Sequence, residues 1–217
     1  MERRITVKGT GQISLKPDLI VITVGLDSLD LDYERAMGLA TQSLDELHQL
    51  MGKAGFNKED LKTTNFNVST QYRGEQDQRG QYIQIFEGYV VHHELKLEFD
   101  MDQDRLTRTL SAIAAAKATP KLDIRFSIKD QTKAMEELLT KATEAAKKKA
   151  QVLAKASGVT LGDLITIDYN WGEQTPYSRT TYAMEDTRMM KSASLAPNIE
   201  PEDISLSDAV TFVWALV

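Results

Sequence analysis

Alternation of apolar and polar residues with a period of two is the dominant pattern along the chain, and it predicts β-strands. The clearest case is residues 121–129, where every second residue is apolar. Similar alternation covers residues 64–72, 94–99 and 165–171. A strand with one apolar and one polar face is typical of antiparallel sheet, in which one face remains in water.

Two further strand-like segments are apolar on both faces. They are residues 19–24 and residues 209–217. Because a strand with two apolar faces must be covered on both sides, we expect these two segments at the centre of a sheet.

Three segments change to the helical period of 3.6 residues. The first runs from residue 32 to about residue 52, with Asp32 as its N-cap. The second covers residues 102–119 and is capped by Asp102 or Asp104. Both begin with an acidic residue in the position that accepts hydrogen bonds from the first turn of a helix.

The third helix is predicted over about residues 130–157, and Gly158 follows as the residue that ends it. Its inward side is expected to consist of Met135, Leu138, Leu139, Ala142, Ala145, Ala146, Ala150, Leu153 and Ala154. Because most of these side chains are alanine, the helix backbone can lie close to whatever it covers.

Helices over antiparallel sheet predict an α+β fold, a two-layer sandwich of long-stranded antiparallel sheets with three helices packed on one face. We expect a single domain over residues 1–217. The alternative is two α+β subdomains, about 1–100 and 101–217, with the strand at 204–217 returning to the N-terminal sheet. Residues 172–203 show no clear period and are predicted to form a long loop.

Composition excludes several kinds of chemistry. The chain has no cysteine, which excludes disulfides, thiolate metal sites and cysteine nucleophiles. Its formal net charge of −6 argues against nucleic-acid binding, which needs a basic surface. Apolar residues make up 41% of the chain, which excludes wholesale disorder.

The local motifs also favour a protein without a catalytic, cofactor or metal site. His93 and Glu94 begin like a zinc-binding HExxH motif, but Leu97 stands at its last position and the segment reads as a strand. Gly9 and Gly11 are followed by a strand and not by a phosphate-binding helix, so they read as structural glycines. If the chain were an enzyme, His93 would be the candidate to mutate.

The start of the chain predicts neither export nor a membrane span. No apolar run follows Arg3 and Arg4, and the apolar patch at residues 19–24 is too short to cross a bilayer. As written, the sequence predicts a cytoplasmic protein. Removal of a leader would instead make it periplasmic or exported.

Several short segments occur in an order that is specific as a set, although each segment alone is not. They are ITVKGTG (5–11), KPDLIVI (16–22), TNFNV (64–68), GYVV (88–91), GVTLG (158–162) and VTFV (210–213), with the alanines of the third helix. This set resembles the SIMPL-domain family, named for a signalling protein that associates with a pelle-like kinase. The family includes bacterial periplasmic and outer-membrane immunogenic proteins, and the resemblance covers nearly the whole chain.

The resemblance implies an α+β fold with packed helices. It also implies assembly, since some similar proteins form large hollow oligomers, and a link to envelope or oxidative-stress phenotypes. It supplies no catalytic residues. The expected function is therefore that of a non-catalytic assembly or interaction protein, whose partner is a second copy of the chain or another protein.

Candidate contact residues lie in the two predicted loops. They are Tyr177, Tyr182, Met184, Met189 and Met190 in the long loop, and Arg73 and Tyr82 at the polar hairpin tip around residues 73–81. The alternative function is a small-ligand binding module, in which Trp171 stacks on a planar ligand such as a flavin.

The third helix also carries a run of lysines at positions 147–149. A solvated helix face is the simpler interpretation of this run. The alternative is contact with an acidic partner or subunit.

Overall fold

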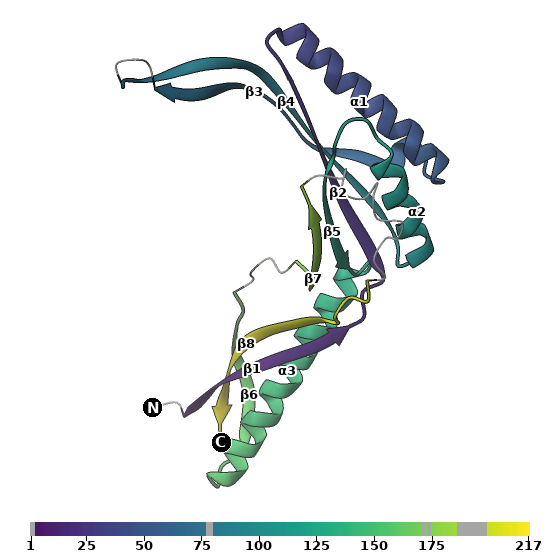
Figure 1. Ribbon diagram of the computed structural model, residues 1–217. Helices are drawn as coiled ribbons and strands as arrows, with labels where there is room; N and C mark the ends of the chain where they lie inside the picture. Colours follow the sequence, from purple (N-terminus) through teal and green to yellow (C-terminus); the bar gives the residue numbers. More distant parts are fainter. Residues whose placement is uncertain (1–2, 77–79, 171, 173–174, 186–198) are drawn as a thin grey trace. The chain divides into compact units, whose positions relative to one another are not determined.

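The computed structural model describes residues 3–76, 80–170, 172, 175–185 and 199–217. Within these residues it contains three α-helices, a single 3-10 turn (Lys58–Asp60) and eight strands in two antiparallel sheets (Figure 1), which confirms the predicted α+β class. The chain forms two compact units. Unit 1 comprises Met1–Asp18, Ser127–Arg179 and Pro201–Val217, and unit 2 comprises Leu19–Phe126 and Thr180–Glu200.

The sheet of unit 1 has three strands in the order β1 (Arg4–Leu15), β8 (Ile204–Leu216) and β6 (Leu161–Asp168). β1 and β8 are antiparallel and in unbroken register along their whole length. β8 is the central strand, as its two apolar faces predict. Since β1 and β8 come from opposite ends of the chain, the two units are interleaved along the sequence.

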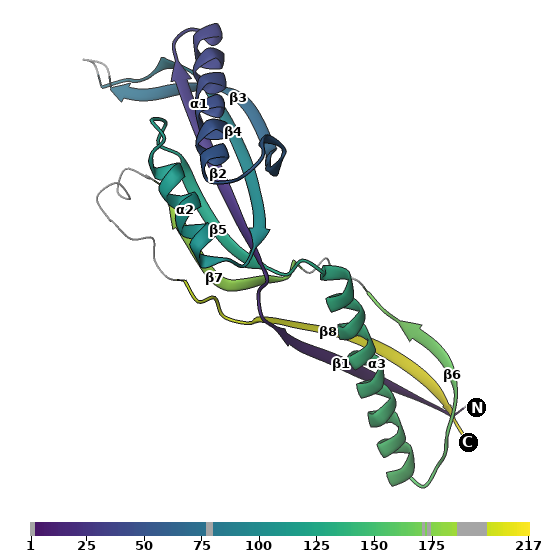
Figure 2. The ribbon, with the colours of Figure 1, turned by 90° about the vertical axis from the view of Figure 1, so that its right-hand side faces the viewer.

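Helix α3 (Gln131–Ala156) lies along the three-stranded sheet (Figure 2). Its first turn is capped by Asp130, whose carboxylate accepts a hydrogen bond from the backbone N–H of Lys133. The buried stripe consists of Leu138 and five alanines, Ala134, Ala142, Ala146, Ala150 and Ala154. The prediction that Leu153 points inward is wrong, since this side chain is 50% exposed. Its neighbour Ala154 continues the four-residue spacing of the stripe, which leaves Leu153 about 100° away around the helix.

The alanine stripe brings the backbone of α3 against β1 at two glycines. A β-carbon at Gly9 would overlap the carbonyl oxygen of Ala142 and lie 2.6 Å from the β-carbon of Ala146. A β-carbon at Gly11 would lie 2.9 Å from the backbone nitrogen of Ala142. Both positions therefore require glycine for a close approach of helix and strand, the structural role predicted for the pair.

The second sheet has five strands in the order β3 (Leu61–Gln76), β4 (Tyr82–Asp100), β2 (Leu19–Asp30), β5 (Lys121–Ser127) and β7 (Tyr177–Met184). β2 is the central strand, as its sequence predicts. Ile20, Ile22 and Val24 are completely buried there.

Helices α1 (Tyr33–Lys53) and α2 (Gln103–Ala114) pack on the strands of unit 2. Asp32 and Asp102 cap them, each accepting a hydrogen bond from the backbone N–H three residues later. The core of this unit is built from large aliphatic and aromatic side chains of α1, α2, β2, β4 and β5. This contrasts with the small side chains under α3.

Strand β7 occupies part of the region that the sequence analysis predicts to be one long loop at 172–203. Tyr177, Thr180, Thr181 and Tyr182 are residue types that favour strands. The segment is short, however, and no clean alternation marks it, so its period could not be recognised. Pairing with β5 at the edge of the sheet stabilises it there.

Candidate interaction site

The hairpin of β3 and β4 extends beyond the strand that lies next to it. β2 pairs with β4 only as far as Asp30 opposite Tyr89. Beyond that point, residues 82–88 of β4 pair only with β3 in the part of the chain that the structure describes. We call residues 71–76 and 82–88 the arm; Figure 1 shows it running out from the rest of its sheet.

Two local features set where the arm leaves the sheet. Gly88 has a φ of 139°, which L side chains rarely adopt, and a β-carbon there would lie 2.8 Å from the carbonyl carbon of Asp30. On the facing strand, the pairing register shifts between Gln71 and Tyr72. Irregularities of this kind bend a strand and change the direction of the residues beyond them. The base of the arm is therefore specified by the sequence.

One face of the arm is aromatic. Tyr72 pairs with Phe86, and their rings meet edge to face with centroids 5.5 Å apart. Phe86 continues this row to Tyr89, at 5.4 Å. Tyr82 projects from the same face nearer the tip and is 77% exposed. We call this the aromatic face.

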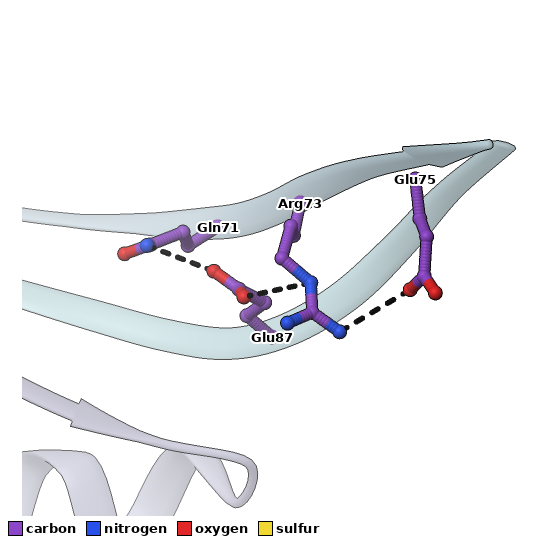
Figure 3. A network of polar contacts seen from close by, with 4 residues as sticks. All are labelled: Gln71, Arg73, Glu75 and Glu87. Carbon is purple, nitrogen blue, oxygen red and sulfur yellow. Dashed lines mark hydrogen bonds and ion pairs between the residues drawn. The ribbon is translucent and has the colours of Figure 1, made fainter. Parts of the chain in front are cut away.

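The opposite face carries Ile83 and Ile85 beside a polar network (Figure 3). Gln71 donates a hydrogen bond of 3.0 Å to Glu87. The Arg73 guanidinium lies 3.6 Å from Glu87 and 3.3 Å from Glu75. Exposed ion pairs of this kind contribute at most about 1 kcal/mol each. We call this the isoleucine face; its two isoleucines are 43% and 36% exposed.

The arm thus exposes apolar side chains on both faces, on a ribbon of two strands. A two-stranded hairpin alone is only marginally stable in water. Exposed apolar clusters and free strand edges are also the surfaces that proteins use to bind other proteins. The arm is therefore the candidate interaction site.

The structure separates the residues that the sequence analysis groups as contacts. Arg73 and Tyr82 lie in the arm. Tyr182 and Met184 instead pack against the core of unit 2, and Tyr177 begins β7 half-buried. Three further residues lie outside the described part of the chain. They are Met189, Met190 and Trp171, the last with its proposed ligand stacking.

Four residues of the arm are not among the contact residues predicted from the sequence: Tyr72, Ile83, Ile85 and Phe86. The available signal was at 82–86, where apolar side chains occur on both parities next to a polar turn. Such a pattern normally predicts burial on both faces. It indicates an interaction surface only once the pairing shows that no neighbouring strand of the described chain covers these residues.

A charged cluster links three neighbouring strands of unit 2. Asp27 of β2 lies 2.6 Å from His92 of β4 and 3.0 Å from Lys121 of β5. Burial raises the pKa of Asp27, but the hydrogen bonds from His92 and Lys121 outweigh it and hold the pKa below its ordinary value of 3.8. The hydrogen bond to Asp27 also raises the pKa of Lys121. The cluster cross-links three strands of the sheet.

Two histidines lie between α1 and the sheet. Nε2 of His93 is 2.8 Å from the Thr63 hydroxyl, and the edge of its ring meets Phe66. Nδ1 of His48 is buried and has no hydrogen-bond partner among the described residues. Burial lowers the pKa of both side chains, and the charge of His48 lowers the pKa of His93 further. Lys58 also lowers the pKa of His48, and Asp45 opposes this shift.

These two histidines predict a loss of stability in mild acid. The unfolded chain takes up protons near the ordinary histidine pKa of 6.5, before the folded chain does. The free energy of unfolding should be constant above that pH and fall as the pH drops below 6.5 toward the lower folded values. Urea titrations at pH 7.5 and 5.5 measure this difference.

The variant His48→Gln tests the assignment. It removes one of the two groups, so it should reduce the fall in stability between pH 7.5 and pH 5.5. The pKa of Asp27 lies below this window and does not contribute. An undiminished fall in His48→Gln would show that other groups are responsible.

Neither a cluster of metal ligands nor a membrane-spanning helix occurs among the residues that the structure describes. Within them, no three histidine, aspartate or glutamate side chains come together as a metal site. No described helix has the length and apolar character needed to span a membrane.

Comparison with known protein families adds a single finding. The family described as SIMPL, protein of unknown function (DUF541), matches residues 5–214. A search of curated proteins finds no match. The region matched by the SIMPL family, residues 5–214, includes parts of both units and the whole arm.

Proposed function

We propose, from the premise that the chain belongs to the SIMPL family, that it is a non-catalytic assembly protein. The arm is its interaction site, and the partner is a second copy of the chain. The link to envelope or oxidative-stress response rests on the family resemblance alone.

One observation carries this proposal: the arm exposes five large apolar side chains that the rest of the described chain does not cover. They are Tyr72, Tyr82, Ile83, Ile85 and Phe86. Apolar area removed from water stabilises a complex by about 25 cal/mol per Å² before the entropic cost of association. Aromatic side chains are also the residues that most often dominate the binding energy of an interface.

The double variant Tyr82→Ser/Ile83→Ser tests the role of the arm. It replaces one apolar side chain on each face and leaves the core of unit 2 untouched. We expect self-association to weaken at least about tenfold, because the variant removes one exposed apolar side chain from each face of the arm, and a few large side chains dominate the binding energy of an interface. Size-exclusion chromatography with light scattering, over a range of concentrations, measures the mass of the assembly for comparison with the 24.3 kDa of one chain.

A matched control is Leu39→Ser, which removes a side chain of similar exposure from α1. It should leave the mass unchanged, and circular dichroism should show that both variants remain folded. A wild-type protein that runs as one chain at every concentration would contradict the proposal. If the arm variant assembles as the wild type does, the arm is not the interaction site.

A further inference from the structure

A second exposed apolar surface lies on unit 1. Val7, Ala145, Lys148, Lys149, Val152 and Leu153 line a shallow groove of about 460 Å³ between β1 and α3. Val152 and Leu153 are 60% and 50% exposed. They lie beside the buried alanine stripe and do not belong to the apolar core between α3 and its own sheet.

The rim of this groove is positively charged. Lys148 and Lys149 border it, and the ammonium group of Lys149 donates a hydrogen bond of 3.2 Å to the backbone carbonyl of Lys8 on β1. The stems of lysine side chains extend an apolar surface while their ammonium groups stay in water. The groove therefore suits a partner that is apolar in the middle and acidic at its edge.

The isoleucine face of the arm has this combination. Ile83 and Ile85 form its apolar part, and Glu75 and Glu87 lie on the same face. Two carboxylates against the single guanidinium of Arg73 leave the face with a net charge of −1. Its apolar and charged parts thus complement those of the groove.

Resting on the proposed function, we infer that the isoleucine face of one copy docks into this groove on a second copy. The two isoleucines lie on Val152, Leu153 and Ala145, and the carboxylates face the lysines. Because the two surfaces differ, each copy offers one of each and the contact is head-to-tail. Such contacts build rings where the rotation closes and filaments where it does not.

The absence of cysteine makes this contact directly testable by disulfide cross-linking. Ile85→Cys protein is mixed with Ala145→Cys protein that carries a tag of different mass, and both are oxidised. A docked pair of thiols has an effective concentration of about 1 mM, so the mixed disulfide should form at least about tenfold faster than between micromolar proteins colliding at random. Mass spectrometry identifies the disulfide that joins the two positions.

The matched control is Gln84→Cys, one residue away on the aromatic face of the same arm. Mixed with Ala145→Cys, it should cross-link at the random rate. Equal rates from Ile85→Cys and Gln84→Cys would overturn the assignment of this face to this groove.

A charge exchange gives a second, independent measurement. Lys148→Glu should slow the Ile85–Ala145 cross-link about tenfold, and Glu75→Lys on the arm-donating protein should restore it. Loss without restoration would overturn the predicted pairing of charges. If light scattering shows assembly but neither the cross-link nor the charge exchange gives the expected result, the docking inference is wrong while the proposed function stands. If the chain does not assemble at any concentration, both the inference and the proposed function are wrong.

Discussion

Replacing Gly9 with alanine is expected to destabilise unit 1 by about 3 kcal/mol. The added methyl group would overlap the carbonyl oxygen of Ala142 and press on the β-carbon of Ala146. Neither atom belongs to a flexible side chain, so α3 as a whole must move away from β1. That movement would also loosen Leu138 and the alanine stripe from the sheet. The expected fall in the thermal midpoint is roughly 10 °C.

The control for this prediction is Gly38→Ala. Gly38 lies within α1, and a β-carbon there meets no atom within 4 Å. Alanine favours helix over glycine, so this variant should gain about 0.5–1 kcal/mol. If glycine-to-alanine substitution lowers the free energy of unfolding at Gly9 and raises it at Gly38, the loss at Gly9 is steric. A Gly9→Ala protein with the wild-type midpoint would contradict the close approach.

Replacing Gly88 with alanine is expected to cost about 3 kcal/mol and to disturb the base of the arm. Two effects add here: alanine is strained at a φ of 139°, and its β-carbon would press on the backbone of Asp30. Because β2 ends at Asp30, the strain falls where β4 leaves the sheet. Urea unfolding measures the loss, and amide hydrogen exchange should show weaker protection in the arm.

Gly74→Ala is the matched control inside the arm. Gly74 has no positive φ, and a β-carbon there would meet the ring of Tyr82 at 3.6 Å, an ordinary contact. Its stability should stay within about 0.5 kcal/mol of wild type. If Gly88→Ala behaves like Gly74→Ala, the backbone at Gly88 does not fix the direction of the arm.

Secondary structure was predictable wherever one local pattern was strong. Asp32, Asp102 and Asp130 mark the three helix starts because a carboxylate at that position satisfies backbone N–H groups. The two doubly apolar segments mark the central strands, because each must be covered on both faces. The separation of the helices over two sheets depends on long-range pairing, for which no local pattern exists.

The interaction site was only partly predictable for the same reason. Polarity around residue 73 indicated a hairpin tip, and Arg73 and Tyr82 lie in the arm. The exposure of Ile83 and Phe86 depends on the point at which β2 stops pairing with β4, which is set at Asp30, more than 50 residues away. In contrast, Tyr182 and Met184 pack against the core of unit 2 because they lie in β7, a strand too short to show a clear period in the sequence.

The pairing of β1 with β8 has a consequence for how the protein is made. Translation proceeds from the N-terminus at about 5–20 residues per second. The ribosome therefore completes β8 roughly 10–40 s after it completes β1. During that time β2, α1, β3 and β4 are already complete, and their pairings lie close together in sequence. The pairings among these elements of unit 2 are therefore expected to form before β8 exists, whereas β1 can pair with β8 only once residues 204–216 have emerged. Until then β1 has no strand to pair with. We therefore expect β1 to be the segment of the nascent chain that binds a chaperone.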